Sequence, residues 1–158
     1  MILSSIIYIE KDGKYLMLHR TRKENDTNKD KWIGVGGKFE EGETPEECAR
    51  RETFEETGLT LNHLRYCGIV TFVSDKYPAE QMHLFSSTAF SGTIKDCDEG
   101  ELDWIDKQKL LSLPIWEGDK IFLRLMDQNL PFFSLKLTYK GNTLEKAVLN
   151  EKEILNKA

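Results

Sequence analysis

The stretch that decides the fold is residues 37–59, GKFEEGETPEECARRETFEETGL. Thr44, followed three residues later by a glutamate, forms a capping box, in which each side chain bonds the other's backbone N–H. Pro45 suits the first position of a helix, and Gly58 suits the left-handed residue that ends one. Together these signals predict a helix over residues 45–57.

The predicted helix carries three carboxylates on one side. At about 100° per residue, Glu52, Glu55 and Glu56 fall within roughly one third of its circumference. The small residues Cys48 and Ala49 share that side, so we expect all three carboxylates to face the body of the protein. Like charges three or four residues apart destabilise a helix by about 0.2–0.5 kcal/mol per pair, and by more near buried surface. A cation should therefore offset this repulsion.

One arginine supplies too little charge for this cluster. Arg51 is adjacent and can bond a carboxylate, but Glu43 adds a further acid. Clustered carboxylates with spare charge fit Mg²⁺ or Mn²⁺, which bind a few carboxylates together with substrate phosphates. A solvated acidic surface helix is the alternative interpretation. The preceding pair Gly36-Gly37 favours the metal site, because glycine lets the backbone approach another group closely.

Length and composition are those of a single domain. The chain has 158 residues, of which 39% are apolar and 31% charged, enough to bury a core without disulfides or a structural metal. Its 3 cysteines form no C-x-x-C pair, which fits a reducing cytoplasm. We expect cytoplasmic localisation and no membrane partner, since no run of about 18 apolar residues occurs. The net charge of −5 argues against binding a nucleic acid polymer.

The segments around the helix read mainly as strands. Asp12-Gly13 joins two β-rich runs, residues 4–9 and 14–19, which predicts a hairpin. Residues 32–39, WIGVGGKF, read as a bending strand. Further strands are expected over 64–74, 81–90 and 102–105, and short helices over 106–111 and 119–127.

The C-terminal segment has two interpretations. Alternating apolar residues from Phe133 to Tyr139, then Gly141 and a second run over 143–149, predict a closing hairpin. The alternative is a terminal helix through residues 145–157. With no internal repeat, we expect one mixed α+β domain over residues 1–158.

Residues 37–59 resemble the Nudix box. A glycine, five residues, Glu43, seven residues, Arg51-Glu52, then Glu55-Glu56 and Gly58-Leu59 stand at the spacing of that signature, with Thr53 in a usually hydrophobic position. The resemblance implies a Nudix hydrolase, with an α/β/α sandwich around a mixed β-sheet. Such an enzyme cuts the pyrophosphate bond of a nucleoside diphosphate linked to another group.

The resemblance also implies roles for residues of the box. The metal would be held by the carboxylates of Glu52, Glu55 and Glu56 with the carbonyl of Gly36 or Gly37. Arg51 would orient the glutamates, and Glu43 would brace the loop. The general base stays open among Glu55, Glu56 and the loop residue Glu99, for which a solvated acidic turn is the alternative.

Beyond the box, the chain resembles MutT-like 8-oxo-dGTP diphosphatases over most of its length. The resemblance rests on residues 16–23 (LMLHRTRK), 31–44, the Asp98-Glu99 turn, 103–105 (DWI) and 114–119 (PIWEGD). It implies that Trp116 stacks on the base and that Asp119 bonds the edge of the base. Two positions depart from it, because Ile33 replaces an amide and Gly118 replaces the first of two paired acids.

Basic residues are the candidates for contact with the triphosphate. They are Arg20, Arg22, Lys23 and Lys38. Arg20 is the best of them, because it ends a predicted strand and is positioned more rigidly than loop residues. A solvated charged face is the alternative. The polar loop over residues 21–31 is expected to close over a ligand.

Three functional hypotheses follow. The leading one is Mg²⁺-dependent hydrolysis of oxidised purine nucleoside triphosphates, with 8-oxo-dGTP giving 8-oxo-dGMP and pyrophosphate, which sanitises the nucleotide pool. The second keeps the chemistry but takes ADP-ribose, dinucleoside polyphosphates or nucleotide sugars. The third is a nucleotide sensor without hydrolysis, which the full set of box carboxylates disfavours. The sequence leaves the oligomeric state and the number of metals open.

Overall fold

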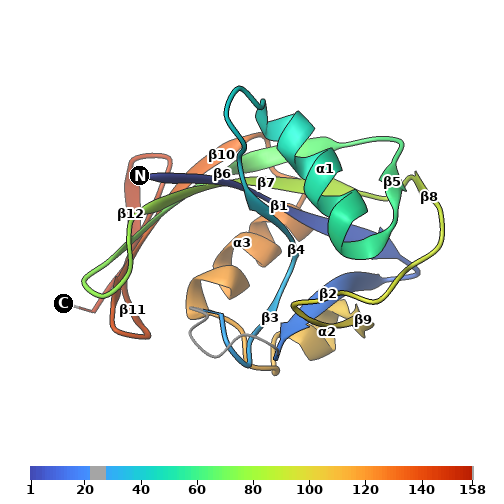
Figure 1. The fold of residues 1–158 in the computed structure, drawn as a ribbon. Helices are drawn as coiled ribbons and strands as arrows, with labels where there is room; N and C mark the ends of the chain where they lie inside the picture. The colour runs from blue at the N-terminus through green and yellow to red at the C-terminus, as the bar shows by residue number, and fades with distance from the viewer. Residues whose placement is uncertain (22–27, 158) are drawn as a thin grey trace.

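A mixed β-sheet runs through the molecule, with helix α1 on one face and α3 on the other (Figure 1). This computed structural model describes residues 1–21 and 28–157. The predicted α+β class and the α/β/α sandwich are confirmed.

The elements follow one another along the chain in a mainly β order. They are β1 (Ile2–Lys11), β2 (Lys14–Arg20), β3 (Trp32–Ile33), β4 (Val35–Lys38), α1 (Pro45–Thr57), β5 (Thr60–Leu61), β6 (Arg65–Ser74), β7 (Glu80–Ser87), β8 (Phe90–Ser91), β9 (Gly100–Asp106), α2 (Lys107–Leu110), α3 (Glu117–Asp127), β10 (Phe133–Lys140), β11 (Thr143–Leu149) and β12 (Lys152–Asn156).

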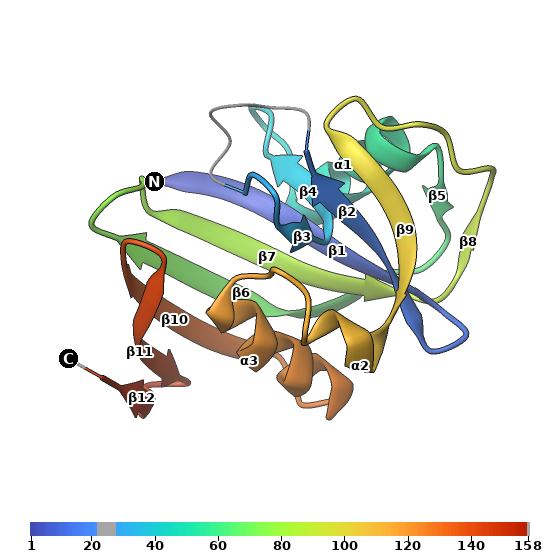
Figure 2. The same ribbon diagram turned by 90° about the horizontal axis from the view of Figure 1, so that it is seen from below.

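The order of the strands in the sheet differs from their order in the chain. It reads β12-β11-β10-β6-β7-β1-β2-β3, while β4 pairs with β1 and β9 with β2. Strand β1 is parallel to β7, and β6 is parallel to β10, whereas the other pairs are antiparallel. Figure 2 shows β6, β7 and β10 side by side, with α3 in front of them. The first strand of the chain therefore lies inside the sheet, where its side chains reach both faces.

Two apolar clusters cover the two faces of the sheet. Ile7, Val35 and Ala49 belong to the cluster beneath α1. Tyr8 and Phe122 belong to the larger cluster on the side of α3. Ile7 and Tyr8 are neighbours in β1, so the alternation of side chains along a strand places them on opposite faces. The same alternation places Ile6 and Tyr8, which line the larger cavity described below, on the side of α3.

Several element boundaries differ from the prediction, among them the strand predicted over residues 32–39, which is divided into β3 and β4, and two others have a clear cause. Strand β7 ends at Ser87, short of the predicted residue 90, because the chain then turns and β8 pairs with β5 instead. Helix α3 begins at Glu117, two residues before the prediction. Trp116 is its N-cap and has extended backbone but no side-chain capping bond, so the usual Ser, Thr, Asp or Asn capping signal is missing there.

The C-terminal hairpin is confirmed and the alternative terminal helix is wrong. β10 and β11 pair antiparallel, and β12 adds a further strand. The second reversal occurs at Asn150 and Glu151, whose φ angles are 47° and 71°. Successive positive φ angles are typical of tight hairpin turns, and they stop a helix.

No helix among the described residues is long and apolar enough to cross a membrane.

Candidate active site

Helix α1 positions the acidic cluster, and both of its ends match the prediction. The Thr44 hydroxyl accepts from the backbone N–H of Glu47 at 3.0 Å, and the Glu47 carboxylate accepts from the Thr44 N–H at 3.0 Å. Gly58 ends the helix with φ at 81°, and its N–H donates to the carbonyl of Phe54. A Cβ at residue 58 would lie 2.7 Å from the Thr93 carbonyl oxygen, so only glycine fits there.

Arg51 lies at the centre of the cluster. It donates to both carboxylate oxygens of Glu43, at 2.6 and 2.9 Å, which is the bidentate geometry of a strong ion pair. It also donates to Glu52 at 2.8 Å, to Glu55 at 3.1 Å and to the Lys38 carbonyl oxygen at 3.0 Å. These bonds raise the pKa of Arg51 and lower the pKa of Glu43. Arg51 therefore fixes the glutamates relative to the loop before the helix.

Glu55 corrects one prediction about the helix. Its side chain is 56% exposed, so the expectation that all three carboxylates face the body of the protein is wrong for this residue. Arg51 stands one turn earlier and bonds Glu55 on the outer side of the helix. In the same part of the helix, Thr53 and Thr57 have no exposed surface.

Glu56 is the buried carboxylate of the cluster. One oxygen, Oε1, accepts from the backbone N–H of Gly36 at 2.7 Å. The other, Oε2, is buried and has no hydrogen-bond partner among the described residues. Burial raises the pKa of Glu56 to about 8, and the nearby charges of Glu99 and Glu52 add to the shift. An unpartnered buried oxygen of this kind favours a bound cation.

The glycine pair before the helix passes very close to its neighbours. Gly36 has a φ of 153°, and a Cβ there would lie 2.0 Å from the Ser5 carbonyl oxygen. A Cβ at Gly37 would lie 2.5 Å from the carboxyl carbon of Glu52. Side chains at either position would push β4 away from β1 or from the acidic cluster. The predicted close approach at Gly36-Gly37 is thus what the structure shows.

The donor set fits a hard divalent cation. Burial and the charge of Glu99 raise the pKa of Glu52 and of Glu56, so negative charge converges here from α1 and from the turn before β9. Oxygen ligands of this kind suit Mg²⁺ or Mn²⁺. Within residues 1–21 and 28–157, however, no three acidic, histidine or cysteine side chains already stand close enough together to hold an ion. Arg51 bonds two of the expected ligands, Glu52 and Glu55.

A cavity of about 780 Å³ connects this cluster to an aromatic wall. Its lining includes nine of the candidates from the sequence, namely Arg20, Ile33, Gly36, Gly37, Lys38, Glu52, Glu99, Trp116 and Asp119. Three other candidates, Arg51, Glu55 and Glu56, are not part of the lining and stand behind it on α1. Arg22 and Lys23, with most of the expected ligand-closing loop, lie outside the described residues.

Trp116 forms part of the aromatic wall and is held in one orientation. Only 7% of it is exposed. Its indole N–H donates to the Asn28 side-chain oxygen at 2.8 Å, and the Lys31 ammonium lies 4.5 Å from the ring centroid. Tyr139 packs edge-on against it at 5.1 Å between ring centroids, and Phe72 does so at 5.9 Å. A large flat side chain fixed in this way suits an aromatic ligand.

Asp119 is a buried acid on the same wall. It stands in the first turn of α3, and burial raises the pKa of its carboxyl group to about 8, against a smaller opposing effect of Lys31. No described residue donates a hydrogen bond to this carboxyl group. A buried polar group of this kind calls for a partner from a ligand or from water.

Arg20 and Glu99 pair with each other across the polar part of the cavity. The guanidinium donates to the carboxylate at 2.9 Å, and both side chains are mostly buried. Arg20 ends β2, while Glu99 stands in the turn just before β9, its neighbour in the sheet. The sequence named both residues as candidates but gave no sign that they form an ion pair.

Sequence reasoning missed the rest of the aromatic wall. The residues it missed include Tyr8, Phe72, Tyr77 and Tyr139, which come from β1, from β6 and the turn after it, and from β10. The alternation of apolar residues in β10 did place Tyr139 on a buried face. It could not show that the neighbouring strand would be β6.

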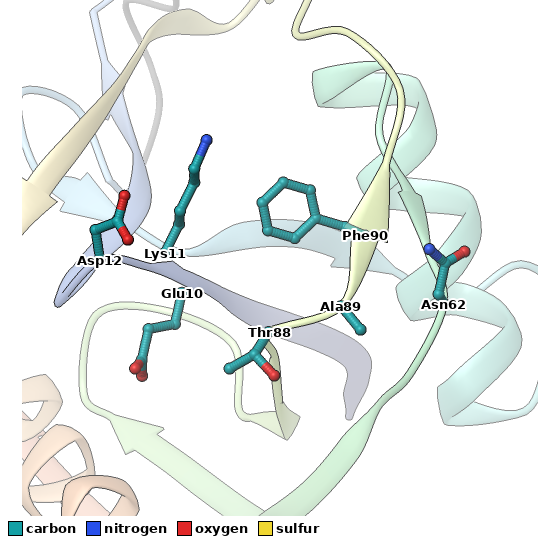
Figure 3. A pocket seen from close by; sticks show the side chains of 7 residues that line it. All are labelled: Glu10, Lys11, Asp12, Asn62, Thr88, Ala89 and Phe90. Carbon is teal, nitrogen blue, oxygen red and sulfur yellow. The ribbon is translucent and has the colours of Figure 1, made fainter.

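A second hollow, of about 560 Å³, lies at the far end of β1 (Figure 3). Figure 3 shows Glu10 and Lys11 extending to opposite sides of the strand, with Phe90 and Asn62 beyond them. Glu10 is already paired with Lys107 at 2.6 Å. The acidic cluster of α1 contributes nothing to this hollow, so we assign the candidate site to the larger cavity.

Comparison with known proteins gives the family. A family model described as the NUDIX domain matches residues 4–126. The chain belongs to the Nudix family. Like other Nudix hydrolases it is an enzyme, and its acidic helix is the Nudix box that the sequence resembles.

Relatives of this Nudix hydrolase carry related names. The oxidized purine nucleoside triphosphate hydrolase of Danio rerio is 30% identical over 131 residues, covering 82% of each chain. The Mus musculus protein of the same name is 32% identical over 103 residues, covering 65% of this chain and 66% of that one. The crystal structure of a MutT protein from Bacillus halodurans matches with a TM-score of 0.83 and 25% identity, over 95% of this chain and 98% of that one.

Proposed function

We propose that this Nudix hydrolase cuts the pyrophosphate bond of purine nucleoside triphosphates and that oxidised purines, with 8-oxo-dGTP first, are its substrates. One observation carries the proposal: a single cavity joins the acidic cluster and glycine pair to a wall formed by Trp116 and Asp119. A nucleotide needs both halves, since its base is flat and apolar on its faces while its phosphates are strongly charged. The names of the animal relatives agree with this assignment.

Different residues of the cavity contact the base and the phosphates of the substrate. Trp116 offers its ring to the base, and Asp119 bonds the edge of the base. Arg20 and Lys38 lie along the polar wall and contact the phosphates. Ile33 gives only apolar contact. These contacts hold the phosphate chain against the carboxylates of α1, in the orientation that hydrolysis requires.

A divalent cation fits the acidic end of the cavity. Glu52, Glu55 and Glu56, with a carbonyl oxygen of Gly36 or Gly37, would hold it, and Arg51 orients two of these acids. Bound there, Mg²⁺ would neutralise phosphate charge and lower the pKa of an attacking water. A nearby carboxylate would accept the proton of that water, and Glu55, Glu56 and Glu99 are the candidates.

The test is a panel of nucleotides assayed for product with and without Mg²⁺. It contains 8-oxo-dGTP, dGTP, dATP, ADP-ribose, a dinucleoside polyphosphate and a nucleotide sugar. We expect 8-oxo-dGTP to have the highest kcat/KM, to release pyrophosphate, and to lose turnover in excess chelator. The Trp116→Ala variant should raise KM for 8-oxo-dGTP, because the stacking surface is worth about 1–3 kcal/mol per base.

Each other outcome removes part of the proposal. A higher kcat/KM for ADP-ribose would replace the sanitising function by the second substrate class. Tight binding without turnover of any nucleotide would make the chain a sensor. An unchanged KM in Trp116→Ala would remove Trp116 from the base site.

A further inference from the structure

Tyr139 meets the start of α3 at one wall of the cavity. Its ring is buried and lines the cavity beside Trp116. The backbone N–H of Gly118 donates to the Tyr139 hydroxyl at 2.7 Å. This bond ties β10 to the first turn of α3, so it fixes the phenol group next to the base end of the proposed site.

Position 118 has no room for a side chain. A Cβ there would lie 2.4 Å from a methyl carbon of Leu137 and 2.8 Å from the Tyr139 hydroxyl oxygen. Both distances are too short for real contacts, so the phenol occupies the space that a residue-118 side chain would use. The polar group at this point of the cavity wall is therefore the hydroxyl of Tyr139.

The hydroxyl of Tyr139 can still donate one hydrogen bond. A phenol carries one donor and an oxygen that accepts, and the oxygen of Tyr139 already accepts from Gly118. Burial and the charge of Asp119 raise the pKa of Tyr139, which keeps the hydroxyl protonated. No described residue accepts its proton. Two other phenols line this wall, those of Tyr8 and Tyr77, and the Tyr8 hydroxyl is engaged with the backbone of Gly34.

We infer that the Tyr139 hydroxyl is a hydrogen-bond donor that makes the site prefer 6-oxopurines over 6-aminopurines. The inference rests on the proposed function and concerns which base that site takes. A 6-oxopurine presents a carbonyl oxygen next to an N–H, so the oxygen accepts from Tyr139 while the N–H donates to Asp119. A 6-aminopurine presents an amino donor instead, which leaves the Tyr139 proton unpaired in a buried place.

The experiment compares dITP with dATP, whose bases differ in having a carbonyl or an amino group at the six position. For the wild type, we expect kcat/KM to be at least about tenfold higher for dITP. In Tyr139→Phe, which keeps the ring, kcat/KM for dITP should fall by about tenfold, and that for dATP should stay within about twofold. Tyr15→Phe is the matched control, because it removes a hydroxyl from another buried tyrosine outside the cavity. It should leave the dITP-to-dATP ratio unchanged.

Two results would overturn the inference. One is a Tyr139→Phe ratio equal to that of the wild type, and the other is an equal loss for both nucleotides, which indicates a structural effect only. If Tyr139→Phe does not fold, the wild-type ratio decides, and a dITP preference below about threefold overturns the inference. If the wild type hydrolyses neither nucleotide, the proposed function fails. Calorimetric Kd values for dIMP and dAMP then apply the same test to base selection alone, with the same expected ratios.

Discussion

The carboxyl group of Glu56 is buried, and burial disfavours its ionised form. One oxygen bonds Gly36, and the other has no partner among the described residues. The unfolded chain pays no such cost, so the ionised form destabilises the folded protein without metal. The same oxygen is the one with capacity left for a cation. An ionised carboxylate at residue 56 therefore lowers the stability of the metal-free protein but favours metal binding.

We predict that Glu56→Gln lowers kcat by at least about 100-fold and raises Tm in the absence of metal. Glutamine keeps the shape and the bond to Gly36 but removes the charge. The measurements are turnover with Mg²⁺ and thermal unfolding in chelator. Glu41→Gln, an exposed acid in the loop before α1, is the control and should change neither value. Full turnover, or a lower Tm without metal, would contradict the assignment.

Asp119 gives a prediction about pH. Burial raises its pKa from 3.8 to about 8, so between these values the folded protein holds a proton that the unfolded chain has released. Stability from this residue is therefore fully present below about pH 4 and is lost as the pH rises to about 8. For one proton the slope is at most about 1.4 kcal/mol per pH unit.

The comparison is between the wild type and Asp119→Asn, unfolded by urea at pH 5, 6, 7 and 8. The free energy of unfolding of the wild type should fall more steeply with rising pH than that of the variant. Parallel curves for the two proteins would mean that Asp119 ionises in the folded state as it does in the unfolded chain.

Strand β4 depends on the absence of a side chain at Gly36. An added methyl group would meet the Ser5 carbonyl oxygen at 2.0 Å, a contact that only backbone movement can relieve. We predict that Gly36→Ala destabilises the protein by more than about 2 kcal/mol and abolishes turnover, because the bond from residue 36 to Glu56 is lost as β4 shifts.

Denaturant unfolding and turnover measure these effects, and Gly13→Ala is the control. Residue 13 also has a positive φ angle, 74°, but nothing lies within 4 Å of a Cβ there. Its substitution should cost only the local backbone strain, about 1 kcal/mol. Equal losses for the two variants would show that crowding at Gly36 is unimportant.

The elements differ in how far the sequence could predict them. Helix α1 matches its prediction at both ends, because Thr44, Pro45 and Gly58 act on their own neighbours in the chain. The start of α3 carries no such local signal, since Trp116 makes no capping bond. The early end of β7 depends on pairing between β5 and β8, which no local pattern contains.

The acidic and aromatic halves of the candidate site also differ in how far the sequence could predict them. Its acidic half comes from one helix and the glycines just before it, so spacing along the chain was enough to predict it. The aromatic half needs strands β6 and β10, whose register places Phe72 beside Leu137. Residues 65 positions apart meet there because the strands are parallel neighbours, and a single sequence shows nothing of that pairing.

At the scale of the whole molecule, the site extends beyond the matched domain. The NUDIX match ends at residue 126, whereas Leu137 and Tyr139 in β10 line the cavity. β10 also covers the edge of β6 and contributes buried residues such as Phe133 and Leu135 to the core. Strand β10 is thus part of both the core of the fold and the larger cavity.

We predict different effects for two truncations. Removing residues 133–158 takes away β10, β11 and β12 and should abolish cooperative unfolding and turnover, because one cavity wall and one core wall are lost. Removing residues 151–158 deletes only β12, which pairs with β11 alone, and should leave kcat/KM within about twofold. Thermal unfolding and turnover of both fragments provide the test. Activity in the shorter fragment would contradict the placement of β10 in the site.

The pairing of β1 with β7 and of β6 with β10 also determines when, during synthesis, the cavity can form. Ile2 pairs with Glu80, and Gly68 pairs with Phe133. Strands β1 and β6 can therefore pair with β7 and β10 only after those later strands have been synthesised. Contacts so distant in sequence fold slowly. Until β10 has been synthesised, the nascent chain carries its complete acidic helix but lacks the part of the cavity wall that Leu137 and Tyr139 form. The larger cavity is therefore completed only after β10 has been made.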